Sequence, residues 1–566
     1  MLKIVIIFLV LFSSLLQSKN LDLVFDGNEN FSNSTLYDAI DIETPFFYAF
    51  WEDEPKADTK EAHKLASLVK DYYRYSGFFH TSTKPIIKDN KIIISIKENI
   101  PITITTMTVN STLNINAQIP FKVGDIFDSE KFKQSKKNIK LFYGNHTYCK
   151  IKLDSKAWID TQTNSAYLAY DVTQNEKCII GDVTIISPES IDTSIIKSLL
   201  YLRKGQPFST KLIKDSYDSL YSGGGISKAL IHTSIDENSN KVNVTVTVEE
   251  NNKPTRLETG LGVNTDEGLM VSLSLENKNM FGNLKTLGLS SRVTKKKQNI
   301  KTYFNMPLSH RNSTGIDIGY ENEEFIGYKE ERVFANIYLS QRKEPHRLTE
   351  SIVFDNSNTY ESDDLVLFPR GKLFITSPKL HWAYDTRDDI LNPKRGHFLI
   401  SEVMGSIKST LSDASYYKFK VKGGYIMPLE NSIIAVQATF GSLNVFDGRI
   451  PASYRFYSGG INSNRAYNYN SLGPENRLGD PIGFRSIFET ILEYRYPIFQ
   501  NVRGVVFSDT TFIGQGDIPE YDNGYYSAGI GFRYETPLGP LALDFGFDID
   551  RPKDNHAIQF RIGEVF

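Results

Sequence analysis

Cysteine, net charge and long apolar runs are all scarce in this chain of 566 residues. The two cysteines, Cys149 and Cys178, are too few for a disulfide framework or a zinc site. The 64 Lys and Arg residues are nearly balanced by 67 Asp and Glu residues. This balance points to neither a nucleic acid nor an acidic partner. After the N-terminus, no apolar run is long enough for a transmembrane helix.

Sequence motifs of common enzyme and cofactor sites are also absent. The chain has no Gly-x-Ser-x-Gly, no His-Glu-x-x-His and no phosphate-binding loop. Its nine histidines are scattered without the spacing of metal ligands. We therefore predict a protein that is not an enzyme and that binds neither a cofactor nor a metal ion.

The first residues have the pattern of a secretory signal peptide. Lys3 supplies a positive charge, an apolar run follows from Ile4 to Leu16, and small or polar residues come next. The run is too short to span a membrane as a helix, and it lacks the period of an amphipathic helix. We predict that residues 1–18 are a signal peptide. The protein would then be periplasmic, secreted, or a β-barrel of the outer membrane.

A loose repeat organises the chain up to about residue 252. Segments 123–153 and 204–231 share a Gly-x-x-Phe start, a capping residue (Asp128 or Ser209), an amphipathic helix and an extended segment. Segment 61–79 is a third copy, with apolar residues at helical spacing. A glycine is expected to stop each helix: Gly77, Gly144 and Gly223.

Two predicted strands follow each copy, which gives three small β-α-α-β-β modules. Their expected bounds are 19–99, 100–176 and 177–252. This organisation resembles the POTRA domains of outer-membrane assembly proteins. The sheet edges of such modules can accept an extended segment of another chain. Alternatively, the modules are spacers between the membrane and a periplasmic partner.

The two cysteines are expected on the hairpin of the second module. A turn near Asp160–Asn164 would bring Cys149 close to Cys178. A disulfide between them would close a loop of about 30 residues and stabilise the protein by roughly 3 kcal/mol. Export permits such a bond. We favour a structural disulfide over two buried thiols.

From about residue 253 the chain consists of strands and turns with a period of two. In 541–550 large apolar residues alternate with small or acidic ones, and 556–566 repeats this pattern up to Phe566. A soluble sandwich could share the alternation. Strands of about ten residues, separated by turns and longer polar loops, fit a transmembrane β-barrel better. We predict a barrel of about 16 antiparallel strands over residues 253–566.

Segments 384–398, 534–547 and 277–290 resemble the barrel of the BamA/TamA outer-membrane insertase superfamily. POTRA domains precede that barrel in the family, so the resemblance covers the whole mature chain. The number of modules and the segment "RFYSGGINSNRAYNYNSLGP" at 455–474 are most similar to the TamA branch. The resemblance implies a barrel in the outer membrane and modules in the periplasm.

In this family a long extracellular loop folds into the barrel lumen, where its arginine pairs with carboxylates. The resemblance assigns that arginine to Arg465 and its partners to Glu493 and Asp509. The chemistry agrees, because a buried guanidinium needs carboxylates that accept its hydrogen bonds. Glu489 is a rival partner, since it lies on the same strand face as Glu493.

The glycines of the loop and the ends of the barrel complete the expected site. Gly459 and Gly460 would allow the loop to turn back into the lumen. Ala466 stands where the family usually has glycine, which would cost about 1 kcal/mol if this residue adopted a positive φ. Phe560 and Phe566 are expected at the seam between the first and last strands and in the terminal signal read by the cell's barrel assembler.

The function implied by the resemblance involves no covalent chemistry. The seam opens laterally and templates a strand of an unfolded outer-membrane protein client. A TamA-like factor would assist the insertion or secretion of autotransporters and other outer-membrane proteins with a TamB-like partner anchored in the inner membrane. The resemblance also permits phospholipid movement between the membranes. The alternatives are a two-partner secretion transporter, which exports a specific protein through the barrel, and a passive porin.

Overall fold

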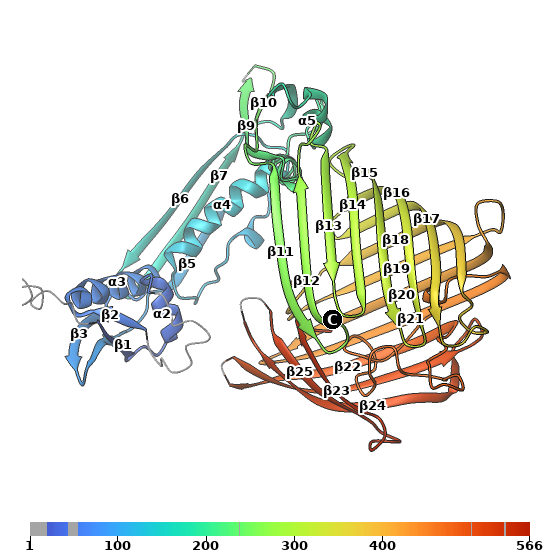
Figure 1. Ribbon diagram of the computed structural model, residues 1–566. Coiled ribbons are helices and arrows are strands. Elements are labelled where there is room, and N and C mark those ends of the chain that lie inside the picture. Colours follow the sequence, from blue (N-terminus) through green and yellow to red (C-terminus); the bar gives the residue numbers. More distant parts are fainter. Residues whose placement is uncertain (1–19, 43–54, 237, 500, 537–538, 566) are drawn as a thin grey trace, which may run out of the picture. The chain divides into compact units, whose positions relative to one another are not determined.

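The computed structural model describes residues 20–42, 55–236, 238–499, 501–536 and 539–565 (Figure 1). The predicted signal peptide at 1–18 lies outside the described residues. Three small sheets precede one large antiparallel sheet. No helix among the described residues is long and apolar enough to cross a membrane.

The first module is a four-stranded sheet with two helices packed against it. In chain order its elements are β1 (Asn20–Asp26), α2 (Asn33–Ala39), β2 (Lys56–Asp58), η1 (Thr59–Glu61), α3 (Ala62–Tyr75), β3 (Ser82–Lys88) and β4 (Lys91–Lys97). The strand order is β2-β1-β4-β3, and β1 runs parallel to β4. Leu23, Val69 and Ile92 are fully buried, because the apolar face of α3 closes a core against the central strands. Gly77, at φ +97°, follows the end of α3 as expected.

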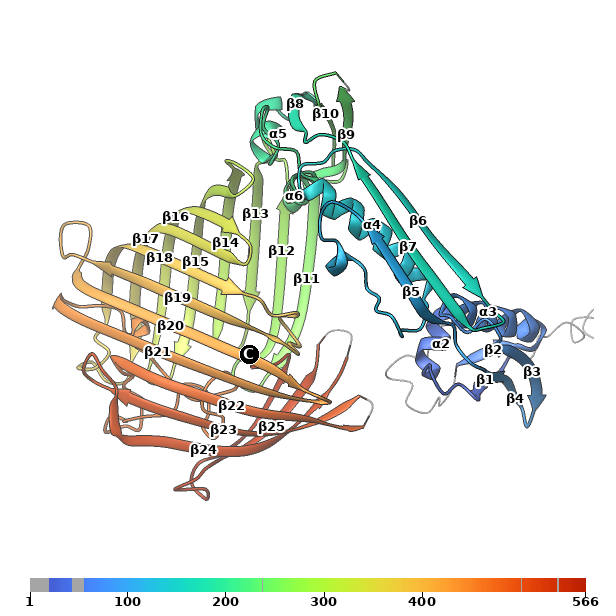
Figure 2. The ribbon, with the colours of Figure 1, turned by 180° about the vertical axis from the view of Figure 1, so that it is seen from behind.

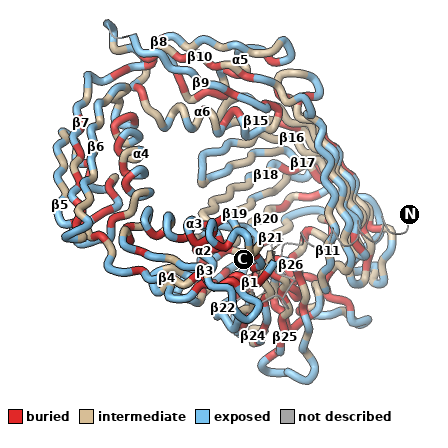
Figure 3. The backbone as a smooth tube through the Cα atoms, turned by 90° about the vertical axis from the view of Figure 1, so that its left-hand side faces the viewer, coloured by how far each residue is buried: buried red, intermediate tan, exposed pale blue. Residues whose placement is uncertain are grey.

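The second module has one long helix rather than the expected pair. Its elements are β5 (Thr103–Asn110), η2 (Asn116–Gln118), α4 (Ser129–Asn145), β6 (Ile151–Asp160) and β7 (Ser165–Gln174), in the sheet order β5-β7-β6. Asp128 caps α4 as expected, since its carboxylate accepts a hydrogen bond from the Lys131 N–H at 2.9 Å. Buried stretches, drawn in red, follow α4 in Figure 3.

The predicted helix stop at Gly144 is wrong. Helix α4 continues through Asn145, so Gly144 lies in its last turn. A Cβ atom on Gly144 would approach Cγ2 of Thr210 to 2.5 Å. The glycine is therefore needed for close packing, and its sequence position alone could not distinguish that role from a helix stop.

The third module consists of β8 (Ile179–Ile186), α5 (Thr193–Leu199), α6 (Thr210–Ser222), β9 (Ile226–Asp236) and β10 (Lys241–Glu250), in the sheet order β8-β10-β9. Val242, Val244 and Val246 alternate with less buried residues along β10, as in a strand with one face in a core. Helix α6 ends one residue before the expected stop at Gly223. The prediction of three α+β modules is confirmed.

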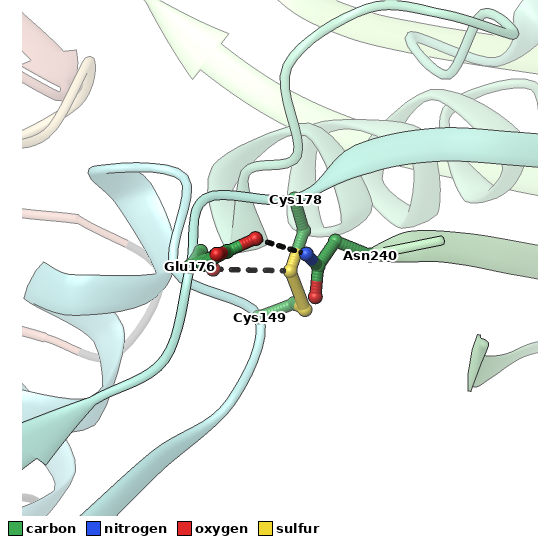
Figure 4. Close-up of a disulfide and its surroundings, with 4 residues drawn as sticks. All are labelled: Cys149, Glu176, Cys178 and Asn240. Carbon is green, nitrogen blue, oxygen red and sulfur yellow. Dashed lines mark hydrogen bonds between the residues drawn. A yellow bond between two sulfur atoms is a disulfide. The ribbon is translucent and has the colours of Figure 1, made fainter. Parts of the chain in front are cut away.

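A disulfide joins Cys149 and Cys178, which are separated by 29 positions and by 5.8 Å between Cα atoms (Figure 4). Cys149 lies just before β6, and Cys178 lies just before β8. The sequence predicts both cysteines on the hairpin of the second module, but the bond reaches the residue just before the first strand of the third. Asn145 at the end of α4 adds a polar link between the second and third modules. Its side-chain oxygen accepts a hydrogen bond from the N–H of Lys211, in the first turn of α6, at 2.8 Å.

The large sheet contains 16 antiparallel strands whose order follows the chain (Figure 2). They are β11 (Thr255–Asn264), β12 (Gly268–Asn277), β13 (Thr286–Val293), β14 (Lys297–Pro307), β15 (Asn312–Phe325), β16 (Tyr328–Lys343), β17 (His346–Ser362), β18 (Gly371–Asp385), β19 (Gly396–Ser406), β20 (Ala414–Leu429), β21 (Ser432–Gly448), β22 (Ser486–Phe499), β23 (Val502–Gly514), β24 (Glu520–Tyr534), β25 (Leu541–Asp548) and β26 (His556–Ile562). The sheet curls into a nearly closed barrel, which confirms the predicted fold class.

Strand β22 shows how the barrel sorts its side chains. Glu493 and Arg495 are almost completely buried, whereas Leu492 and Tyr494 are 49% and 44% exposed. Successive side chains of a strand point to opposite faces, so the charged residues face the lumen and the apolar residues face outward. This is the parity expected from the sequence, and it directs the acids toward the barrel interior.

The disulfide generates a testable prediction for the second and third modules. A Cys149→Ser/Cys178→Ser variant should keep its barrel but lose about 3 kcal/mol of stability in this region, because the unfolded chain regains loop entropy. Hydrogen exchange of the full-length protein in detergent would measure this loss as weaker amide protection in β6, β7 and β8. The wild-type protein in reductant should behave as the variant does, and unchanged protection in both would contradict the prediction.

Candidate functional site

The connection between β21 and β22, residues 449–485, contains the candidate site and is called the lumen loop. It includes the short helix η3 (Ala452–Tyr454). Connecting loops are normally exposed, but Ser458, Asn464, Arg465 and Leu472 are each at most 1% exposed. Their burial and their contacts with inward-facing strand residues show that the loop is folded into the barrel.

Arg465 is completely buried and is held by three carboxylates. Its Nε and Nη2 atoms donate to the two oxygens of Asp509 at 2.9 and 2.6 Å, which is a bidentate pair. Its Nη1 atom donates to Glu493 at 2.5 Å and to Asp544 at 3.3 Å. The backbone N–H of Arg465 also donates to Asp509 at 3.0 Å. The structure thus brings together the three residues that the family resemblance selected and adds Asp544.

Phe507 supports the same guanidinium from one side. The central guanidinium carbon of Arg465 lies 3.5 Å from the centre of the Phe507 ring, a cation–π contact. Phe507 precedes Asp509 by two positions on β23, so both side chains face inward. Strand parity could have identified Phe507, whereas nothing in the sequence marked its ring as the face on which the arginine stacks.

The Arg465 site is part of a larger charge network inside the barrel. Asp544 binds Arg533 at 2.6 Å and Arg561 at 3.0 Å, and Glu493 binds Arg495 at 2.8 Å. Four cations and four carboxylates make up the network, which we define as Arg465, Arg495, Arg533, Arg561, Glu493, Asp509, Asp544 and Glu564. Equal numbers of opposite charges allow every member to be buried with a partner.

Glu489, the rival partner, does not bind Arg465. Its Oε1 atom accepts hydrogen bonds from the hydroxyls of Ser458, at 2.7 Å, and Ser463. Both serines belong to the lumen loop, so this carboxylate also holds the loop, at a different point. The sequence placed Glu489 on the correct strand face, but Glu489 lies four positions before Glu493 on β22 and therefore binds other groups.

Glycines allow the loop to approach its surroundings closely. Gly459 and Gly460 adopt φ values of +102° and +105°, and a Cβ atom on Gly459 would lie 2.4 Å from the carbonyl oxygen of Asn468. Ala466 does not adopt a positive φ, so the expected strain does not arise. A Cβ atom on Gly546 of β25 would instead lie 2.5 Å from the Arg465 carbonyl oxygen. The glycine that this approach requires is therefore on the barrel wall.

At the barrel ends, the carbonyl oxygen of Phe560 accepts a hydrogen bond from the Thr265 N–H at 3.2 Å. Phe560 therefore lies at the seam between the first hairpin and the last strand. Phe566, the other residue expected at the seam, lies outside the described residues.

Within the part of the chain that the structure describes, no three His, Cys, Asp or Glu residues are grouped as metal ligands.

Removing the guanidinium of Arg465 should destabilise the barrel. Arg465→Ala would leave Glu493 and Asp509 buried without their main partner, at a cost of about 3–5 kcal/mol. Thermal unfolding in detergent and protease cleavage of the lumen loop would measure the effect, with Arg477→Ala as control because Arg477 is an exposed arginine of the same loop. Equal stability and equal cleavage of the two variants would contradict the role assigned to Arg465.

Comparison with known proteins agrees with this architecture. The family model described as the Omp85 superfamily domain matches residues 229–566, and the surface antigen variable number repeat, or POTRA, matches 102–175 and 178–251. Outer membrane protein assembly factor BamA of Nitratidesulfovibrio vulgaris is 21% identical over 460 residues, which cover 75% of this chain and 56% of that protein. The same factor of Neisseria meningitidis is 18% identical over 638 residues, covering 97% and 78%.

A solved structure shares the fold. The crystal structure of BamA from Haemophilus ducreyi lacking POTRA domains 1–3 superposes with a TM-score of 0.62 and 18% identity, covering 82% of this chain and 99% of that one. The Omp85 match extends over more than half of the chain. The protein therefore belongs to the Omp85 superfamily, with its β-barrel in the outer membrane and its POTRA modules in the periplasm.

Proposed function

We propose that this protein is an outer-membrane assembly factor of the TamA type. It assists the insertion or secretion of autotransporters and other outer-membrane proteins. The superfamily assignment supports a role in outer-membrane protein assembly or secretion, and the three sheets before the barrel support the TamA branch in particular.

The observation that carries this proposal is the weak connection between β11 and β26. All other neighbouring barrel strands are joined by hydrogen-bonded ladders, whereas the described residues form no ladder between these two. Each unpaired N–H or C=O group costs several kcal/mol in lipid. A client strand that supplies the missing hydrogen bonds is therefore favoured at this edge.

In the proposed mechanism, the charge network keeps the rest of the barrel intact while the seam opens. Arg465 connects β22, β23 and β25 through Glu493, Asp509 and Asp544. Opening is then confined to the boundary between the first and last strands. No covalent bond is formed or broken, so the protein is not an enzyme and needs no cofactor.

The periplasmic modules are the proposed contact points for partners. Ile86 and Ile87 are exposed on β3, an edge strand of the first sheet. An edge strand with exposed apolar side chains is suited to strand addition. We propose that a TamB-like protein anchored in the inner membrane docks on the modules, and that phospholipids also move between the membranes through this partner.

Client templating can be tested by photocrosslinking at the barrel edge. A photoreactive amino acid at Leu261 of β11, whose side chain is 81% exposed, should crosslink to an unfolded outer-membrane protein during its assembly. The same amino acid at Ile337 of β16, which is 50% exposed and paired on both sides, is the control. Equal client adducts at the two positions would contradict templating at the seam.

The partner can be identified by crosslinking and pull-down from the native membrane. We expect a large protein anchored in the inner membrane to be recovered with the full-length chain. A single secreted protein, recovered without such a partner, would instead indicate a two-partner secretion transporter. Neither partner nor client would be expected for a passive porin.

A further inference from the structure

The turn between β11 and β12 provides the hydrogen bonds that join the first hairpin to β26. Besides the Thr265 N–H bond to Phe560, the Thr265 hydroxyl donates to the side-chain oxygen of Gln559 at 2.7 Å. The same hydroxyl accepts from the Phe560 N–H at 3.3 Å. Among the described residues, every hydrogen bond between the first hairpin and β26 therefore involves Thr265.

Asp266, the next residue in the turn, binds the lumen loop. Asp266 is 6% exposed, and its carboxylate accepts hydrogen bonds from the Ile461 N–H at 3.1 and 3.3 Å. Gly460 makes the approach possible, because a Cβ atom there would lie 2.7 Å from the same carboxylate. The first hairpin is therefore attached to the loop inside the barrel as well as to the last strand.

Strand β26 also binds the lumen loop at Ile461, through the carbonyl group of this residue. Arg561 donates from Nη1 to the Ile461 carbonyl oxygen at 3.2 Å, and it is paired with Asp544 of the charge network. Gln559 adds a second bond, from its side-chain nitrogen to the Tyr467 carbonyl oxygen at 3.1 Å. Ile461 is thus bound at its N–H by the first hairpin and at its C=O by β26.

We propose that this part of the lumen loop is a clasp across the seam, with Asp266 as the residue that positions it. The clasp goes beyond the proposed function, because it concerns what holds the barrel ends together in the absence of any client. A ladder of backbone hydrogen bonds would normally join β11 and β26. Here Ile461 of the loop and Thr265 of the turn join them instead. Release of Ile461 from Asp266 and opening of the seam are then one event, while Arg465 keeps the rest of the loop in the lumen.

The clasp depends on a hydrogen-bond acceptor rather than on a negative charge. Burial raises the pKa of Asp266 to about 6, although the hydrogen bond from the Ile461 N–H and, to a smaller extent, the charges of Lys296 and Arg561 partly offset this rise. Asparagine has a similar shape and keeps an acceptor oxygen without the charge. Asp266→Asn should therefore preserve the clasp, and Asp266→Ala should remove it.

Spin labels across the seam can measure this difference. The two native cysteines are bonded to each other, so cysteines added at Leu269 of β12 and Ile558 of β26 can be labelled selectively. Both side chains are exposed, at 66% and 59%. The labelled wild-type protein in lipid should give a narrow distance distribution in pulsed electron paramagnetic resonance. Asp266→Ala should broaden the distribution and shift it to longer distances, and Asp266→Asn should not.

A second label pair and a second variant make the test decisive. Labels at Ile337 and Ile352, which face each other on β16 and β17, should keep their distance in every variant. Gly460→Ala should also break the clasp, because a Cβ atom at Gly460 would lie 2.7 Å from the Asp266 carboxylate. This variant provides the test if Asp266→Ala fails to fold. A seam distance in Asp266→Ala or Gly460→Ala that equals the wild-type distance would overturn the proposal. The measurement needs no client or partner, so its outcome is separate from that of the proposed function.

Discussion

The burial of one guanidinium inside the barrel is the constraint on which the rest of the structure depends. An arginine without partners at this position would cost several kcal/mol, so the barrel wall must present carboxylates where the loop enters. Asp509, Glu493 and Asp544 meet this requirement from three different strands. Those acids in turn need cations, which Arg533 and Arg561 supply. The loop and the barrel wall therefore stabilise each other, because without the other each would contain buried charged groups that lack a partner.

The same loop bears on the weakest part of the barrel. A closed barrel has no edge strand, and a barrel that closes without a ladder between its ends retains two. The proposed clasp at Ile461 places the loop between these ends, only four positions before Arg465. The ion pairs of Arg465 and the few hydrogen bonds to Ile461 thus lie on one short segment. The ion pairs keep the segment in the lumen, while the few hydrogen bonds leave the seam able to separate.

Much of the architecture could be predicted because it repeats along the chain. The alternation of side chains in β22 and β25 predicts a barrel and directs Glu493 inward. The errors concern single residues whose roles depend on distant parts of the chain. The sequence predicts a helix stop at Gly144, but this residue packs against Thr210. It also predicts strain at Ala466, whereas the close approach is between the loop backbone and Gly546. A glycine gives the same local signal in either case.

The sequence by itself determined the three modules, the strand period and the identity of Arg465 as an unusual cation, because these are properties of local order and spacing. Only the tertiary structure decided that Asp544 and Phe507 also hold the guanidinium, that Glu489 binds serines, and that Cys178 links the second module to the third. The physical reason is that strand parity fixes the face on which a side chain lies. Barrel closure and loop entry decide which residues from separate strands come within hydrogen-bonding distance.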